Sequence, residues 1–124
     1  MSVRAHPMAL IRPTLASRKV RSAHELARMP DRAPVEVAGL VIVRQRPETA
    51  RGIVFVSLED ETGIANLVVM PDVYDRFRAT IHGASFLLAR GKVERNGMVV
   101  NVRVESVAPV ALAPQVGDRA RDFR

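Results

Sequence analysis

Phe55, Ser57 and Asn66 are the side chains of this sequence whose types and spacing best suit contact with a planar, polar ligand. They lie in residues 53–69, where two alternating apolar runs predict a β-hairpin. The period of two places them, with Val68, on one face of that hairpin. The opposite face carries the aliphatic set Val54, Val56, Leu58, Ala65, Leu67 and Val69.

An aromatic ring on the outer face of a sheet can stack on a nucleic-acid base, and an amide can hydrogen-bond a base edge. We therefore interpret Phe55 as a stacking residue. Burial of Phe55 beneath the N-terminal segment is the competing interpretation. For Asn66, contact with a base edge and simple hydration are equally compatible with the pattern.

Basic residues gather near the two predicted loops on either side of this hairpin face. They would form cationic walls that contact phosphates. The alternative is that they are solvated charges that keep strand edges from pairing with other chains. The first loop region carries Arg44, Arg46 and Arg51, and the second carries Arg90, Lys92 and Arg95.

The acidic residues offer little for catalysis. Glu59, Asp60 and Glu61 fall together on the predicted hairpin turn, without a histidine or lysine partner that would suggest acid–base work. The chain has no cysteine, and its three histidines have no metal-ligand spacing. No phosphate-binding glycine loop or nucleophile motif is present. We expect no cofactor, no metal and no enzymatic activity of the chain on its own.

The elements that must hold these side chains follow from periodicity and turn signals. A long strand over residues 35–46 is interrupted by Gly39, where we expect a bulge or sharp bend. The hairpin of residues 53–69 turns at Gly63, which supplies a positive φ. Residues 71–81 predict a helix whose apolar stripe packs on a barrel end. Residues 84–95 and 98–109 predict two more strands joined by Asn96-Gly97.

This order predicts an all-β fold, a five-stranded Greek-key barrel of the oligonucleotide/oligosaccharide-binding (OB) type with a helix between strands 3 and 4. Residues 35–110 form the barrel domain. Residues 1–34 form an N-terminal arm with a short helix, which begins at the capping box Ser22-Ala-His-Glu25. Residues 111–124 form a flexible tail.

Charge and hydropathy limit the partners and the location that we expect for the chain. The net charge is +6, but residues 35–110 carry nine basic and nine acidic residues, so the excess lies in the flanks. The arrangement of the charges on the barrel therefore matters more than their sum. No apolar run approaches the roughly 20 residues of a membrane span. We expect no membrane partner and a cytoplasmic location.

Several phrases of the sequence resemble one family. They are Val37-Ala-Gly-Leu-Val41, Arg44-Gln-Arg-Pro47, Gly52-Ile-Val-Phe-Val-Ser-Leu-Glu-Asp-Glu-Thr-Gly63, Asn66-Leu-Val-Val69 and Arg90-Gly-Lys-Val93. Together they resemble the C-terminal OB barrel of bacterial C-family DNA polymerase III α-subunits, most closely the error-prone branch. Arg4-Ala-His-Pro-Met8 and Ala23-His-Glu-Leu-Ala27 are similar to the segment that links this barrel to the preceding polymerase domain.

The resemblance implies contact with single-stranded template DNA during replication, repair and translesion synthesis, with polymerisation supplied elsewhere. Two alternatives remain. The face could dock the rest of a polymerase or mutasome subunits, with DNA incidental. The shorter pattern from Phe55 to Gly63 is also shared with anticodon-binding barrels of class II aminoacyl-tRNA synthetases, which implies an RNA-binding domain with Phe55 and Asn66 facing the bases.

Overall fold

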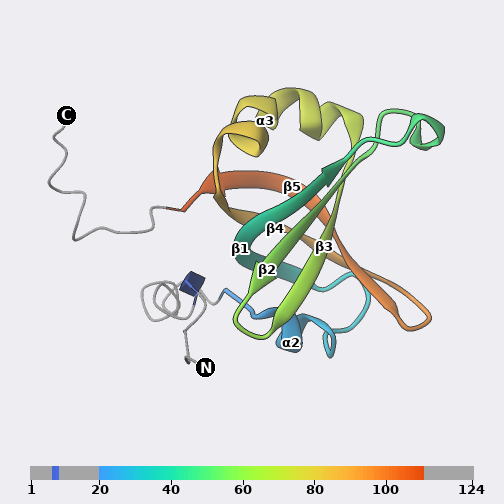
Figure 1. Cartoon of the computed structure of the whole chain (residues 1–124). Helices are drawn as coiled ribbons and strands as arrows, with labels where there is room; N and C mark the ends of the chain where they lie inside the picture. The colour runs from blue at the N-terminus through green and yellow to red at the C-terminus, as the bar shows by residue number, and fades with distance from the viewer. Residues whose placement is uncertain (1–6, 9–19, 111–124) are drawn as a thin grey trace, which may run out of the picture.

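The computed structural model describes residues 7–8 and 20–110, and these form a closed five-stranded barrel with the strand order β1-β2-β3-β5-β4 (Figure 1). The strands are β1 (Pro34–Gln45), β2 (Val54–Asp60), β3 (Gly63–Val69), β4 (Phe86–Asn96) and β5 (Val99–Pro109). All neighbouring pairs are antiparallel except β3 and β5, which are parallel. The predicted five-stranded barrel is confirmed.

Strand β1 belongs to both sides of the barrel, because its first half pairs with β4 and its second half with β2. Gly39 lies where the strand changes partner, and a Cβ there would lie 2.7 Å from the Glu59 carbonyl oxygen. The predicted bulge at Gly39 is wrong in position. The register shift falls between Val41 and Val43, and Gly39 instead permits the close approach of β2.

The alternation predicted for the β2–β3 hairpin is confirmed. The six inward residues are all buried in the main core, whereas Phe55 and Asn66 on the other face are exposed. Gly63 ends the turn with φ +153°, as predicted. The period of two therefore separates a dry interior from an accessible outer face.

Two helices cover the two ends of the barrel (Figure 1). Helix α3 (Pro71–Gly83) buries Tyr74 and Ile81, which belong to the predicted apolar stripe. It begins with Pro71 in its first turn, where proline is favoured. Helix α2 (Ala23–Leu26) covers the other end and buries Ala23 and Leu26. Its predicted capping box is confirmed, because the Ser22 side chain accepts from Glu25 N–H and the Glu25 carboxylate accepts from Ser22 N–H.

The described part of the N-terminal segment packs on the barrel exterior. Met8 and Val20 are buried with Ala38, Phe86 and Leu88, which lie on β1 and β4. A backbone bridge between Arg21 and Val37 continues this contact. The division into an arm of residues 1–34, a barrel and a tail stays a prediction, and the tail, residues 111–124, lies outside the described residues. None of the helices within residues 7–8 and 20–110 is long and apolar enough to cross a membrane.

Candidate nucleic-acid interface

Cross-strand pairing arranges the outer face of the barrel in two rows that run across four neighbouring strand pairs. Residues opposite one another in adjacent strands point to the same side of the sheet, so each row is a line of neighbouring side chains. The first row is Gln45, Phe55, Val68, Arg103 and Lys92, and the second is Val43, Ser57, Asn66, Asn101 and Glu94.

Phe55 lies within the first row and is 37% exposed. Its neighbours in that row are Gln45 on β1 and Val68 on β3. Of the described N-terminal residues, Met8 and Val20 pack on β1 and β4 around Phe86, and α2 packs on the core at one barrel end, so neither covers Phe55. An aromatic ring with an open face beside polar side chains can stack on a base.

Ser57 and Asn66 are directly opposite each other on β2 and β3. The Ser57 hydroxyl donates to the Asn66 Oδ1 atom at 3.0 Å. This bond holds the Asn66 amide in one orientation, with its NH₂ group available as a donor. A carbonyl oxygen on a base edge or a phosphate oxygen can accept from it.

Two of the predicted phosphate-contacting arginines are engaged at helix ends. Arg44 donates from Nε to the Ile81 carbonyl oxygen at 2.8 Å and from Nη2 to the Ala84 carbonyl oxygen at 3.2 Å, at the C-terminus of α3. Such a cation satisfies unpaired carbonyls and complements the negative end of the helix dipole. Its guanidinium is therefore directed at the helix and away from the Phe55 row.

Arg95 plays the corresponding part just beyond α2. Its Nη2 atom donates to the Ala27 carbonyl oxygen at 2.6 Å and to the Met29 carbonyl oxygen at 2.9 Å. Its backbone N–H donates to the Asp31 carboxylate at 2.8 Å. The side chain thus fastens the segment before the barrel to β4.

The loop between β1 and β2 holds the other two predicted cations of the first group. Arg46 lies over the Tyr74 ring, with its guanidinium carbon 5.3 Å from the ring centroid. Arg51 follows the short 3-10 helix η2 (Glu48–Ala50) and adopts a left-handed conformation with φ 55°. Arg51 is exposed and makes no hydrogen bond or ion pair within residues 7–8 and 20–110.

The two remaining predicted cations lie two residues apart on β4 but in different surroundings. Lys92 ends the Phe55 row, opposite Arg103, and its side chain has no ionic or hydrogen-bonding partner in the described part of the chain. Arg90 is opposite Glu36 on β1 and Ser106 on β5. The structure therefore brings Phe55, Ser57, Asn66 and Lys92 onto one face, with Arg46 and Arg51 in the adjoining loop, and leaves Arg44, Arg90 and Arg95 elsewhere.

The prediction missed Arg103, which occupies the first row between Val68 and Lys92. It is exposed, and its Nη1 atom lies 3.4 Å from the Glu94 Oε2 atom. The alternation of Val102, Arg103 and Val104 shows in the sequence that Arg103 faces outward. Its place beside the hairpin face depends on the parallel pairing of β3 with β5, which no local pattern indicates.

The acidic turn has a structural role, as predicted. Asp60 is 6% exposed, and its carboxylate accepts from Ala23 N–H at 2.7 Å. It also accepts from the N–H and hydroxyl of Thr62 and from Gly63 N–H. Asp60 therefore joins the hairpin turn to α2 across the lower end of the barrel (Figure 1).

A closed barrel in this strand order, with a helix between its third and fourth strands and polar side chains on β2 and β3, defines the class of OB folds. The family described as an OB-fold nucleic acid binding domain matches residues 35–110. That span is more than half of the chain, and the chain belongs to this family.

The most similar curated relatives include error-prone DNA polymerases. The one from Anaeromyxobacter dehalogenans is 78% identical over 123 residues, which cover 99% of this chain and 11% of the relative. The one from Caulobacter vibrioides is 50% identical over 105 residues, covering 85% of this chain and 10% of the relative. The chain thus spans about a tenth of the length of these relatives.

Solved structures share the fold at low sequence identity. The asparaginyl-tRNA synthetase from Pyrococcus horikoshii superposes with a TM-score of 0.61 at 21% identity, over 82% of this chain and 26% of that one. RecG bound to a three-way DNA junction gives a TM-score of 0.59 at 17% identity, over 75% of this chain and 13% of that one. These likenesses establish the barrel architecture.

Proposed function

We propose that the chain is the single-stranded-DNA-binding module of an error-prone DNA polymerase and contacts template DNA through the outer face of β2 and β3. The observation that carries the proposal is the exposed Phe55 ring, which shares its row with two cations and lies beside the Ser57–Asn66 pair. The identity of 78% to an error-prone polymerase supports the same conclusion.

In this proposal Phe55 stacks on a base, Asn66 donates to a base edge, and Arg46, Arg51 and Lys92 contact phosphates. Ser57 orients the Asn66 amide through its hydroxyl. Arg44, Arg90 and Arg95 are left out, because two of them are engaged at helix ends and the third faces Glu36. Nucleotide transfer belongs to other parts of the longer polymerase. The chain contributes DNA binding and needs no cofactor for it. It acts in the cytoplasm, where the bacterial DNA lies.

We expect weak binding by the chain alone, micromolar or worse, because one aromatic platform and a few phosphate contacts provide little affinity. The test is fluorescence anisotropy with labelled single-stranded DNA, RNA and duplex at two salt concentrations. The proposal requires a preference for single-stranded DNA and an affinity that falls with salt. A preference for RNA would favour the anticodon-type alternative.

Phe55→Ala is the decisive variant. Loss of stacking should weaken binding by roughly 1–3 kcal/mol. Val68→Ala is the matched control, since it removes apolar surface from the same row without removing a ring. Equal affinities of wild type and Phe55→Ala would contradict the stacking role.

A specific observation also favours docking of a protein as a second candidate function. Met98, Val99 and Ile64 are 97%, 57% and 52% exposed. Ile64 and Val99 each lie two residues before a member of the Asn66–Asn101 pair, and therefore on the same side of the sheet. The remainder of a polymerase or a mutasome subunit could cover this surface, and Met98→Ser with Val99→Ser would then abolish association without affecting DNA binding.

A further inference from the structure

Arg32 is held in an unusual backbone conformation on the turn that precedes the barrel. Its φ is 71°, and the only other positive φ of a non-glycine residue among the described residues belongs to Arg51. A left-handed conformation costs such a residue on the order of 1 kcal/mol, and strain of this kind gathers at functional sites. The Arg32 N–H donates to the Val93 carbonyl oxygen at 2.7 Å, which fixes the turn against β4.

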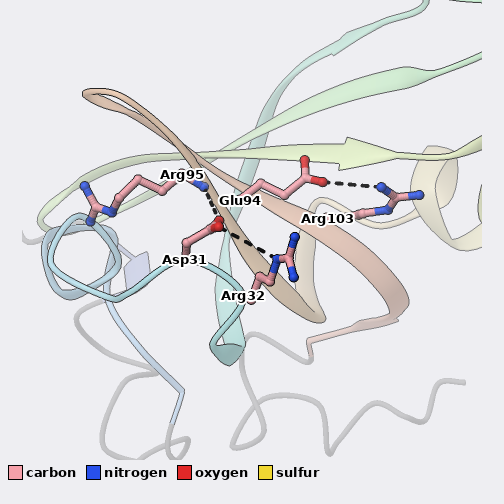
Figure 2. A network of polar contacts seen from close by, with 5 residues as sticks. All are labelled: Asp31, Arg32, Glu94, Arg95 and Arg103. Carbon is pink, nitrogen blue, oxygen red and sulfur yellow. Dashed lines mark hydrogen bonds and ion pairs between the residues drawn. The ribbon is translucent and has the colours of Figure 1, made fainter.

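The Arg32 side chain lies beside the end of the Phe55 row. Val93, to which Arg32 is bonded, directly follows Lys92, and Lys92 is opposite Arg103. In the view of Figure 2 the Arg32 guanidinium lies beside the Asp31 carboxylate, below the Glu94–Arg103 pair. The pairing continues the row from Lys92 to Pro34, and Arg32, two residues earlier, lines the same hollow as Lys92 and Arg103.

The surface around these three cations is concave and carries positive charge. A hollow of about 580 Å³ is lined by four basic residues, Arg32, Lys92, Arg95 and Arg103, and by two acidic ones, Asp31 and Glu94. A second hollow of about 480 Å³, toward α3, shares Lys92 and Arg103.

A third hollow of about 300 Å³ offers a contrast. It contains Arg90 and Arg21 with Glu36 and Glu105, so that its charges balance. Positive charge in a hollow favours an anion, because a concave low-dielectric wall strengthens the local potential. Of the two exposed cations of β4, Lys92 therefore lies in a surface suited to an anion, and Arg90 does not.

The acidic residues of the larger hollow make only long contacts with the Arg32 and Arg103 side chains. The Arg32 Nε atom is 3.9 Å from the Asp31 Oδ2 atom, and the Arg32 side chain is 89% exposed. The Arg103–Glu94 contact is 3.4 Å long and also exposed. Exposed ion pairs of this kind contribute about 0–1 kcal/mol, so a phosphate could replace them at small cost.

We propose that Arg32, Lys92 and Arg103 form a binding site for the backbone phosphates of a nucleic acid, which extends the Phe55 row onto the turn before the barrel. The inference rests on the proposed function and adds the path of the strand, across β2, β3, β5 and β4 to residues 31–33. With strands about 4.8 Å apart, Phe55 and Lys92 are separated by about 14 Å along this path. A short oligonucleotide therefore reaches Phe55 without reaching Arg32.

The test compares two labelled oligo-dT probes, of about 4 and about 12 nucleotides, with the whole 124-residue chain. Arg32→Gly and Lys92→Gln should each weaken binding of the longer probe by roughly 5- to 10-fold at low salt and reduce the salt slope by about 0.7. Binding of the shorter probe should weaken less than binding of the longer probe, because a short probe can occupy the Phe55 face with fewer contacts to these cations. Arg32→Gly should also leave the thermal midpoint intact or raise it, because glycine adopts a positive φ without strain.

Arg90→Gln is the matched control for Lys92→Gln, since it removes the same charge two residues away on the same strand. Equal losses from the two variants would overturn the site in favour of general electrostatics. Unchanged binding of the longer probe by Arg32→Gly, while Phe55→Ala still weakens it, would overturn the site and leave the proposed function standing. Failure of the wild-type chain to bind either probe would overturn the proposed function and this site together.

Discussion

The ends of the barrel and its outer face use basic side chains for different purposes. At the ends, Arg44 and Arg95 donate to backbone carbonyls beside α3 and α2. On the outer face, Lys92 has no partner among the described residues, and Arg103 has one long contact. An arginine next to the carbonyl end of a helix completes the fold, whereas a cation on the sheet that donates to no helix carbonyl keeps its side chain open to solvent.

The comparison makes a clear division between stability and binding. Substitutions at the ends should lower the free energy of unfolding and leave nucleic-acid affinity nearly unchanged. Substitutions on the face should do the reverse. Four variants test this division, from the largest expected effect to the smallest.

Asp60→Ala should have the largest effect and should act on stability alone. It removes a buried carboxylate that accepts from four donors and joins the hairpin turn to α2. We expect a loss of about 3 kcal/mol in the free energy of unfolding, because charged hydrogen bonds are lost and buried N–H groups lose their acceptor. Urea denaturation followed by circular dichroism measures it. Glu61→Ala, at an exposed position of the same turn, is the control and should change stability much less.

Arg95→Gln should lower the free energy of unfolding by about 1–2 kcal/mol. The variant loses charge-assisted bonds to the Ala27 and Met29 carbonyl oxygens, which have no other donor in the described contacts. Oligonucleotide affinity, measured by anisotropy below the unfolding transition, should fall less than for Lys92→Gln. A loss of affinity as large as that of Lys92→Gln, with stability intact, would erase the distinction between end and face.

Arg51→Gly should weaken DNA binding and leave the free energy of unfolding nearly unchanged, which is the opposite of the effect expected for Arg95→Gln. Glycine relieves the left-handed conformation at φ 55°, so the free energy of unfolding should stay within about 1 kcal/mol of the wild type. The salt slope of DNA binding should fall by about 0.7, as expected for one lost phosphate contact. Arg51→Asn is the matched variant, because asparagine tolerates this conformation, and it should bind DNA as weakly as Arg51→Gly.

Ser57→Ala should have the smallest effect. The lost bond to the Asn66 Oδ1 atom is exposed, and its removal should cost about 0.5 kcal/mol of stability or less. Freed from Ser57, the Asn66 amide can rotate, so we expect the affinities for oligo-dT and oligo-dA to change relative to one another. Identical ratios in wild type and variant would show that Ser57 does not orient Asn66.

Much of this arrangement could be predicted from the sequence because it depends on local patterns. Alternation placed the six predicted inward residues of the β2–β3 hairpin in the core and Phe55 and Asn66 on the exposed face, and Ser22 with Glu25 identified the start of α2. The positive φ of Gly63 follows from the turn it must make.

The parts that could not be predicted depend on contacts between distant segments. Arg44 is 37 residues from its acceptor Ile81, and Arg95 is 66 residues from Met29, so their roles as helix caps have no local signal. Arg103 reaches the Phe55 row only through the parallel pairing of β3 and β5. The sequence identifies these side chains as cationic but does not show where each one lies. Only the strand pairing of the closed barrel determines which of them lie on the outer face with Phe55.

The parallel pairing of β3 with β5 also has a consequence for how the chain acquires its shape. The β2–β3 and β4–β5 hairpins join neighbouring segments, whereas β3–β5 and β1–β4 close loops of more than thirty residues. Distant pairings are slow because loop entropy is lost before any contact compensates for it. The two hairpins should therefore form early, and the Phe55–Arg103 row should appear only at the final closure. Stopped-flow refolding would then show hairpin formation before oligonucleotide binding is recovered.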